Sequence, residues 1–390
     1  MKIDSIDIRI TELPVRVKRI FSSGSYDTGP AEQLLGKPVF VSINAEGVQG
    51  HAQIRPISPG HFVADTAHSV VSAIEHVYAP LMIGRRISDM EAIDDLLTSR
   101  LAGNPAARAV LDIALHDALG KALGLPVHDL IGGRCQDEIA LEWSVSLADE
   151  VEIMIEEARK AVEEYGIKVL CLKAAGRGGW RRDVENFAAV RRAVGDGIVI
   201  GVDPNTGWTI PETISAMAAM REFDLGYMEQ PILRRDVRGL AEIRAKACGV
   251  PLMADESLFT IQDAAELAQA RAVDIFCIKL YQVGGLLPAR KIAAIGEANG
   301  IQINSGGLAV ASQFEAAASA HFCATIPARR TFGAAEFAFG VGPKGPDPLV
   351  AEGAMSIADG AVRVPTGPGL GLTLDPKALE RMTLRRVVVS

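Results

Sequence analysis

Apolar and polar residues follow one pattern in the first third of this chain and another beyond it. Residues 1–10 and 38–44 alternate apolar and polar side chains, which is typical of half-buried strands, and residues 51–54 are expected to add a third strand of an antiparallel meander. Residues 61–79 and 90–97 are predicted as helices, and residues 104–123 repeat apolar positions with helical spacing. Three strands followed by helices predict an α+β domain over about residues 1–130.

Beyond residue 137, short apolar runs alternate with helical segments, which indicates βαβ units around a parallel sheet. The strands we predict are residues 139–145, 167–173, 198–203, 226–229, 251–255, 274–279, 301–304 and 331–337. The predicted helices between them are residues 150–165, 184–194, 211–221, 237–248, 261–270, 286–299 and 309–322. Eight strands suffice to close a barrel. A solenoid has a similar repeat length, but these strands share no leucine consensus.

The chain after Glu336 becomes rich in Gly and Pro and then contains short strand-like pieces at 361–364 and 384–389. We expect this tail to run back to the first domain. The predicted organisation is a capping domain over residues 1–130, completed by about residues 356–390, and a barrel over residues 135–355.

Five of the predicted barrel strands end in an ionisable residue, at intervals of 30, 26, 26 and 24 residues: Lys173, Asp203, Glu229, Asp255 and Lys279. A parallel strand is covered on both faces, so a charge belongs only at its open end. In a barrel of parallel strands these ends converge on the mouth where active sites lie. The spacing therefore predicts one site that holds all five groups.

Three acidic groups without a nearby His or Cys suit Mg²⁺ or Mn²⁺ better than Zn²⁺. Asp255 is preferred to Glu256 as a ligand, because neighbours in an extended strand point to opposite sides. Asn205, two residues past Asp203, can bond a ligand carboxylate or the substrate, or serve the turn. Taken one at a time, such acids also cap helices or pair with lysines.

Lys173 and Lys279 lie on either side of the three acids in strand order. Desolvation and a nearby cation both disfavour a charged lysine, so one of these amines could accept a proton while the other delivers one. A metal ion would stabilise the charge that develops when a carbon beside a carboxylate loses its proton. A single strand-end lysine would otherwise extend its amine to solvent.

The motifs around these residues are similar to those of the enolase superfamily, in its muconate lactonizing enzyme subgroup. They are C-L-K, V-D-P-N, M-E-Q-P, A-D-E-S and I-K-L-Y-Q-V-G-G, ending in or containing the five residues. The resemblance covers the whole chain and implies a modified TIM barrel, (β/α)₇β, with an N-terminal α+β capping domain. It also implies that Asp203, Glu229 and Asp255 bind Mg²⁺, while Lys173 and Lys279 are the acid/base catalysts.

Two positions depart from patterns of that superfamily. The usual K-x-K on the second strand is Cys171 followed by Leu and Lys173, so one amine is replaced by a thiol. The mandelate racemase subgroup carries a His after the seventh strand, where this chain has Asn304 and Ser305. The first departure puts the substrate's orientation or the identity of the main base in question.

The resemblance assigns substrate recognition to loops of the capping domain and to the ends of the last barrel strands. The candidate contacts in this chain are Tyr26, Arg55, Cys171, Asn205, Ser305 and Glu336. Arg55 would meet a second anion or form an interdomain salt bridge, and Glu336 would meet a substrate ammonium.

Two lysines on opposite faces of a substrate favour a racemase or epimerase acting on a small amino-acid derivative, proline-like or N-substituted. The alternatives in the same superfamily are a dehydratase, for example of a hydroxyproline, and a muconate-type cycloisomerase. More distant alternatives are a Schiff-base aldolase and an inactive metal-binding barrel. The resemblance further suggests a homo-oligomer, either a dimer or an octamer.

Composition narrows the partners and the compartment. The net charge of −8 and the lack of a basic tract argue against nucleic acid or an anionic membrane as a partner. The five cysteines form no C-x-x-C pair, which favours a reducing, cytoplasmic setting. No apolar run reaches the ~18 residues of a membrane span. The expected partner is a small carboxylate.

Overall fold

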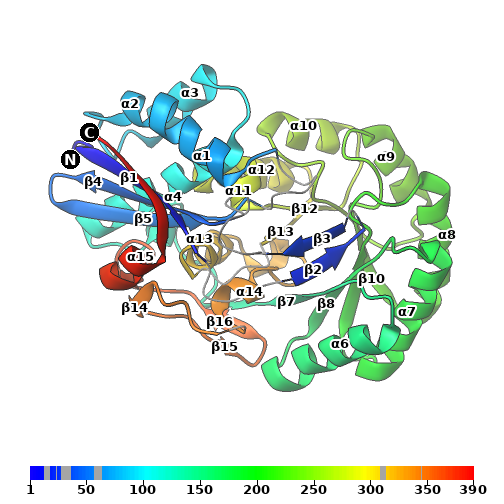
Figure 1. Cartoon of the computed structure of the whole chain (residues 1–390). Helices are drawn as coiled ribbons and strands as arrows, with labels where there is room; N and C mark the ends of the chain where they lie inside the picture. The colour runs from blue at the N-terminus through cyan, green and yellow to red at the C-terminus, as the bar shows by residue number, and fades with distance from the viewer. Residues whose placement is uncertain (13–17, 23, 28–36, 57–63, 308–312, 344) are drawn as a thin grey trace.

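The computed structural model describes residues 1–390 apart from 13–17, 23, 28–36, 57–63, 308–312 and 344, and it consists of an antiparallel sheet with helices beside a curled parallel sheet (Figure 1). The first residues of the helices predicted at 61–79 and 309–322 fall outside this described part. None of the described helices combines the length and the apolar content that crossing a bilayer requires. All five cysteines are free thiols.

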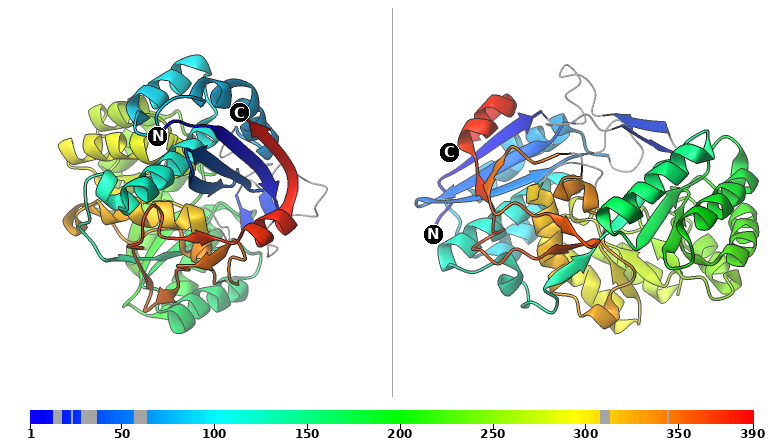
Figure 2. Two further views of the ribbon diagram at one scale, coloured as in Figure 1. Left: turned by 90° about the vertical axis from the view of Figure 1, so that its left-hand side faces the viewer. Right: turned by 90° about the horizontal axis from the view of Figure 1, so that it is seen from below.

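The N-terminal sheet is a meander of β1 (Ser5–Thr11), β4 (Val39–Ala45) and β5 (Val48–Ile54), as the alternating pattern predicts. β18 (Thr383–Val389) pairs antiparallel with the outer edge of β1, so strands far apart in sequence share this sheet. Figure 2 shows the red C-terminal strand beside the blue N-terminal one in both views. The tail thus supplies the fourth strand of the sheet, in the order β18-β1-β4-β5.

Helices cover one face of this sheet. The longest is α4 (Pro105–Leu123), whose residues are largely buried. The other helices of this part are α1 (Ala67–Ala73), the π-helix η2 (Ile74–Tyr78), α2 (Ala79–Met82), α3 (Met90–Arg100) and α5 (Val127–Leu130). Thr66 and Ser69 form a capping box that begins α1.

Gly50 of β5 permits the closest approach between the sheet and α4. A Cβ at this position would lie 2.1 Å from the carbonyl oxygen of Ala114 and 2.5 Å from the amide nitrogen of Ala118. Because both are backbone atoms of one helix, the helix itself would have to move away.

Gly50→Ala is therefore expected to lower the free energy of unfolding by about 1–3 kcal/mol or more, the cost of overpacking a core. Urea denaturation followed by circular dichroism measures the change. Gly197→Ala is the matched control, because a Cβ at Gly197 meets nothing within 4 Å. Equal stability of the two variants would contradict the prediction.

The second sheet contains seven parallel strands in the order β13-β12-β11-β10-β9-β8-β7. Their bounds are β7 (Glu142–Val145), β8 (Val169–Lys173), β9 (Val199–Asp203), β10 (Leu225–Glu229), β11 (Leu252–Ala254), β12 (Ile275–Cys277) and β13 (Gln302–Asn304). The outer helices are α6 (Val151–Tyr165), α7 (Gly179–Val194), α8 (Ile210–Met220), α9 (Val237–Lys246), α10 (Ile261–Gln269), α12 (Leu286–Ala298) and α13 (Gln313–Ala324). The predicted alternation of strand and helix is confirmed.

The prediction of a regular eighth strand at 331–337 is wrong. This segment joins its neighbours through two isolated bridges, Ile303 with Thr331 and Leu141 with Ala335. The amide of Glu142 donates to the carbonyl of Ala335 at 2.8 Å, so the segment still lies between β13 and β7. Gly333 has φ +61°, a left-handed conformation that interrupts an extended strand.

The first predicted barrel strand is also divided. β6 (Glu138–Ala140) leaves the barrel and pairs with β16 (Ala361–Arg363) of the tail, while β7 alone enters the parallel sheet. The remaining elements are β2 (Lys18–Phe21), β3 (Gly24–Asp27), η3 (Arg221–Phe223), α11 (Leu280–Val283), η4 (Ala328–Arg330), α14 (Ala338–Val341), β14 (Val350–Glu352), β15 (Ile357–Ala358), β17 (Thr373–Leu374) and α15 (Pro376–Met382). The division between capping domain and barrel at residues 130–135 and 355–356 stays a prediction.

Candidate active site

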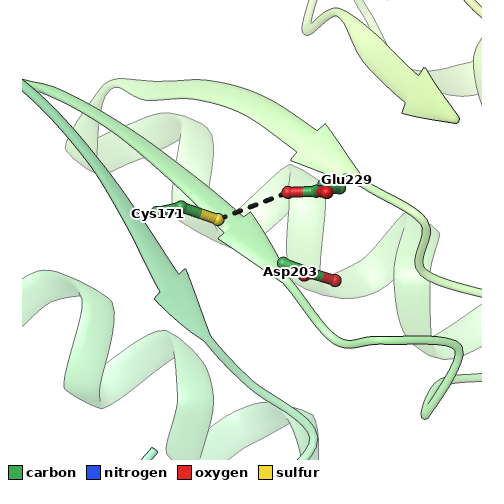
Figure 3. Close-up of side chains that lie close together, drawn as sticks. All are labelled: Cys171, Asp203 and Glu229. Atoms are coloured by element: carbon green, nitrogen blue, oxygen red, sulfur yellow. Dashed lines mark hydrogen bonds between the residues drawn. The ribbon is translucent and has the colours of Figure 1, made fainter. Parts of the chain in front are cut away.

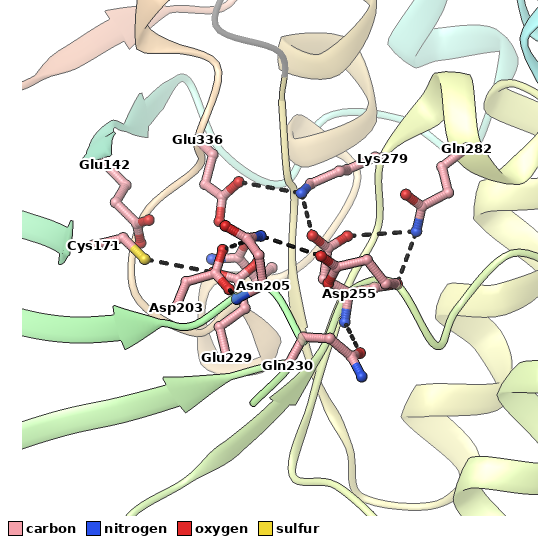
Figure 4. A network of polar contacts seen from close by, with 12 residues as sticks. Glu142, Cys171, Asp203, Asn205, Glu229, Gln230, Asp255, Lys279, Gln282 and Glu336 are labelled. Atoms are coloured by element: carbon pink, nitrogen blue, oxygen red, sulfur yellow. Dashed lines mark hydrogen bonds and ion pairs between the residues drawn. The ribbon is translucent and has the colours of Figure 1, made fainter. Parts of the chain in front are cut away.

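The five predicted ionisable residues lie together at the C-terminal ends of the parallel strands. Lys173, Asp203 and Glu229 are the last residues of β8, β9 and β10, while Asp255 follows β11 and Lys279 lies between β12 and α11 as the N-cap of that helix. All five side chains are buried. Figure 4 shows Lys279 and Asp255 facing Asp203 and Glu229 across the mouth. The spacing along the sequence thus locates this cluster correctly.

Each lysine pairs with one acid. The amine of Lys173 bonds Oδ2 of Asp203, and the amine of Lys279 bonds Oδ2 of Asp255. Burial alone lowers a lysine pKa, but the adjacent carboxylates outweigh it, so the pKa of both lysines lies well above the ordinary value. The lower lysine pKa that is expected beside a bound cation stays a prediction.

Glu229, like Asp203, is completely buried. Its Oε2 accepts a hydrogen bond from Sγ of Cys171 at 3.5 Å, and its Oε1 has no hydrogen-bond partner (Figure 3). Burial, followed by the charge of Asp203, raises the pKa of Glu229 well above its ordinary value. A cation beside this carboxylate would favour its charged form.

Several buried oxygen atoms at the site have no hydrogen-bond partner. Besides Oε1 of Glu229, they include Oδ1 of Asn205, Oε2 of Glu256 and Oε1 of Glu336. In the described part of the chain, the potential ligand atoms of Cys171, Asp203 and Glu229 lie within 4.8 Å of one another. Asp255 is outside this group because its carboxylate is turned to Lys279. These acidic groups can hold a divalent metal ion, since oxygen donors suit hard cations.

Asn205 holds the Asp203 carboxylate in place, as the sequence suggests it could. Its backbone N–H donates to Oδ1 at 2.7 Å and its Nδ2 donates to Oδ2 at 2.8 Å. The same Nδ2 donates to Oε1 of Glu256 at 3.1 Å. Asn205 has φ 44°, so the turn after β9 has a left-handed backbone where it orients the acid.

The expectation that Glu256 points away from the site is wrong. Its carboxylate is buried and linked through Asn205 to Asp203. The reason is that β11 ends at Ala254, so Asp255 and Glu256 lie in a turn and do not alternate as neighbours in a strand do.

Sequence reasoning missed two polar groups inside the barrel. Glu142 on β7 is buried, and its Oε2 accepts a 2.6 Å hydrogen bond from the hydroxyl of Tyr227. Gly201 makes room for this ring, since a Cβ there would lie 2.1 Å from Cζ of Tyr227. Burial and then Glu336 raise the pKa of Glu142 well above its ordinary value. A single acid within an apolar strand gives little signal in the sequence.

Residues of the N-terminal hairpin reach the mouth. The amine of Lys173 lies 5.7 Å from the ring centroid of Phe21 at the end of β2. The hydroxyl of Ser22 donates to the backbone carbonyl of Asn205 at 3.2 Å. Tyr26 lies on β3, where its backbone pairs with Arg19 of β2, and its contact with substrate stays a prediction.

The other residues predicted to contact substrate lie in different parts of the structure. Glu336 lies 3.8 Å from the Lys279 amine, at the mouth. Ser305 is buried after β13, and its carbonyl accepts from the amide of Glu336 at 2.9 Å. Arg55 is buried just past β5, where its charge acts on Glu315 of α13. The contacts predicted for Arg55, with a second anion or in an interdomain salt bridge, stay predictions.

The buried carboxyl of Glu315 should make the free energy of unfolding depend on pH. Burial raises its pKa to about 8, and Arg55 only partly opposes the shift. An unfolded glutamate titrates near ~4.3. Between these two values the folded chain retains a proton that the unfolded chain has lost, so the free energy of unfolding falls as the pH rises.

Glu315→Gln should therefore remove a negative slope of up to about 1.4 kcal/mol per pH unit across that window. Urea denaturation at a series of pH values measures it. The control is Glu152→Gln on the exposed face of α6. Identical slopes in wild type and Glu315→Gln would contradict the prediction.

Two models of protein families match most of the chain. Residues 153–378 match the model described as "Enolase C-terminal domain-like", and residues 33–132 match "Mandelate racemase / muconate lactonizing enzyme, N-terminal domain". The chain belongs to the mandelate racemase/muconate lactonizing enzyme family of the enolase superfamily. The resemblance inferred from the five motifs is therefore confirmed.

Relatives within this family include an N-succinyl-L-Arg/Lys racemase of Bacillus cereus, 30% identical with 100% of both chains covered. A chloromuconate cycloisomerase of Cupriavidus necator is 30% identical over 98% of this chain and 99% of its own. An L-Ala-D/L-Glu epimerase of Bacillus subtilis is 31% identical over 79% of this chain and 81% of its own. The crystal structure of the Bacillus cereus racemase superposes with a TM-score of 0.90 at 28% identity and covers 100% of both chains.

These relatives confirm the fold and the class of enzyme. The chain has the family's cap and barrel, and it is an isomerase of the racemase, epimerase or cycloisomerase kind. The relatives act on small carboxylates, in agreement with a small-molecule substrate. Enzymes of this family generally depend on a divalent metal ion, and the acidic groups of the mouth match that requirement.

Proposed function

We propose that the protein is an Mg²⁺-dependent racemase of N-acylated α-amino acids that uses Lys173 and Lys279 as its acid/base pair. The observation that carries the proposal is the placement of the two amines. Each pairs with a different acid, Asp203 for Lys173 and Asp255 for Lys279, at opposite ends of the row of strands β8 to β12. A planar group held between them would present one face to each amine.

Asp203, Glu229 and Asp255 would hold the ion. Bound Mg²⁺ would supply positive charge to stabilise the negative charge that develops on the substrate carboxylate. Asn205 fixes the orientation of Asp203, and Gln282 of α11 donates to the backbone oxygen of Asp255 at 2.8 Å. These partners hold the acids ready before the substrate arrives.

The lysines move the proton. A cation held by Asp203 and Asp255 would compete with the two ammonium groups for these carboxylates, which would lower the pKa of both lysines toward the range in which an amine can accept a proton. One lysine then removes the α-proton from its face, and the other returns a proton from the opposite face. This exchange inverts the configuration at the α-carbon, and the reverse assignment serves the other enantiomer.

The likeness to the N-succinyl-L-Arg/Lys racemase supports an N-acyl amino acid as the substrate class. Among the residues at the mouth, Glu336 beside Lys279 offers a carboxylate to a cationic or hydrogen-bonding part of the substrate. The ring of Phe339 packs against that of Trp143, with the two centroids 4.6 Å apart, so Phe339 belongs to the hydrophobic core.

The test is a panel of N-succinyl and N-acetyl amino acids incubated with Mg²⁺ in D₂O. Proton NMR follows loss of the α-proton signal, and chiral chromatography follows the opposite enantiomer. We expect both with at least one N-acyl amino acid and neither after chelation of the metal. Conversion of cis,cis-muconate or a dipeptide, with no exchange in any N-acyl amino acid, would refute the proposal in favour of a cycloisomerase or an epimerase.

A further inference from the structure

Cys171 brings a thiol to the carboxylates of the mouth. Its Sγ, one oxygen of Asp203 and one oxygen of Glu229 lie within 4.8 Å of one another, and all three residues are buried (Figure 3). They come from the neighbouring strands β8, β9 and β10, so the backbone fixes their mutual positions. The sulfur and Oε2 of Glu229 already share a 3.5 Å hydrogen bond.

The Glu229 carboxylate supplies a second, independent indication of a ligand. The side chain is completely removed from solvent, so no bulk water reaches its Oε1, and this oxygen also lacks a hydrogen-bond partner. A buried carboxylate oxygen without a partner is costly unless a cation or a donor meets it. Oδ2 of Asp203 already accepts from the amine of Lys173 and from Nδ2 of Asn205, whereas Oδ1 accepts from the backbone N–H of Asn205 and retains a lone pair for a metal ion.

We infer that Cys171, Asp203 and Glu229 form a binding site for a thiophilic divalent cation such as Zn²⁺ or Cd²⁺. One thiolate and two carboxylates provide three ligands of a four-coordinate ion, and water or an added ligand provides the fourth. Binding replaces the thiol proton with the cation, so one proton is released to solvent for each ion bound. Mg²⁺ gains little from sulfur, so Cys171 distinguishes the two kinds of ion.

The site shares Asp203 and Glu229 with the proposed Mg²⁺ ligands, so the two ions would exclude each other. Zn²⁺ or Cd²⁺ is therefore expected to compete with Mg²⁺. A lysine at position 171 would repel a cation, whereas the thiol attracts a soft one. The inference concerns metal binding alone and does not require that the protein catalyse racemisation.

Cadmium tests the site, because a cadmium–thiolate bond has a charge-transfer absorption in the ultraviolet. The starting protein carries Cys135→Ser and Cys248→Ser, which remove the two exposed thiols. We expect this protein to develop the band and to bind one Cd²⁺ per chain by calorimetry. Adding Cys171→Ser should abolish the band and lower the affinity for Cd²⁺ by more than about 100-fold. This loss exceeds the cost of removing an outer-sphere partner, because a direct ligand is lost.

Cys277→Ser is the matched control, since this second buried thiol lies within 4.8 Å of Glu229 and Glu336. The band should persist in that variant. Asp203→Asn keeps all the buried thiols and should lower the affinity for Cd²⁺. Circular dichroism verifies the fold of each variant. Absence of the band from the starting protein, its survival in Cys171→Ser, or its loss in Cys277→Ser would overturn the assignment.

The result is separable from the proposed activity, because the band is recorded without substrate. A band together with no α-proton exchange would refute the racemase and leave the cation site intact. Exchange in the Mg²⁺ protein together with no band would refute the cation site and leave the racemase intact.

Discussion

Lys279→Met is expected to lower kcat for racemisation by about 10²–10⁴-fold, the usual contribution of a positioned acid or base. Lys173→Met should have an effect of the same size. The two variants should nevertheless differ in isotope exchange. If each amine serves one face of the substrate, each variant should lose exchange of the α-proton for one enantiomer and keep some for the other.

Proton NMR in D₂O with each enantiomer of an accepted N-acyl amino acid measures this difference. Lys246→Met on α9 is the control, because that lysine pairs with Glu242 at the surface and should leave kcat unchanged. Loss of exchange for the same enantiomer in both active-site variants would argue for a single base and against a two-lysine mechanism.

Glu229→Gln is expected to abolish divalent-cation binding and the activity that depends on it. The change keeps the size of the side chain but removes the charge from a completely buried acid of the cluster. Loss of an outer-sphere partner already costs about 10–100-fold in metal affinity, so loss of a direct ligand should cost more than about 100-fold. Calorimetric titration with Mn²⁺ or Mg²⁺ measures the affinity.

Chelation should likewise remove the activity of the wild-type protein, and added Mg²⁺ should restore it. Glu222→Gln in η3 is the control for Glu229→Gln, since Glu222 is exposed and lies before the start of β10, whereas Glu229 is at the end of that strand. A Glu229→Gln protein with wild-type cation affinity would eliminate this residue as a ligand.

The five ionisable residues of the mouth were predictable because two physical constraints act on them. Parallel strands exclude charge except at their ends, and the βαβ repeat brings those ends together. Lys173, Asp203 and Glu229 are accordingly the last residues of their strands. The roles of all five rest on the family resemblance and on the experiments above, whereas their proximity follows from the fold.

Other features needed coordinates. The position of Glu256 depends on where β11 ends, which an apolar run extending to Asp255 conceals. The hydrogen bond between Glu142 and Tyr227 crosses the barrel between residues 85 positions apart in the sequence. The charge of Arg55 acts on Glu315, which lies far along the chain, so neither residue indicates the other in the sequence. Contacts of this kind are set by packing and have no local period.

The pairing of β18 with β1 bears on the order in which the protein folds during synthesis. The barrel strands follow one another along the chain, so each can pair with its predecessor as it leaves the ribosome. The partner of Ile6, by contrast, is Val389. Until that segment has been synthesised, one edge of β1 lacks its partner and stays exposed to other nascent chains, so this sheet gains its protection from aggregation only after the barrel strands have been made.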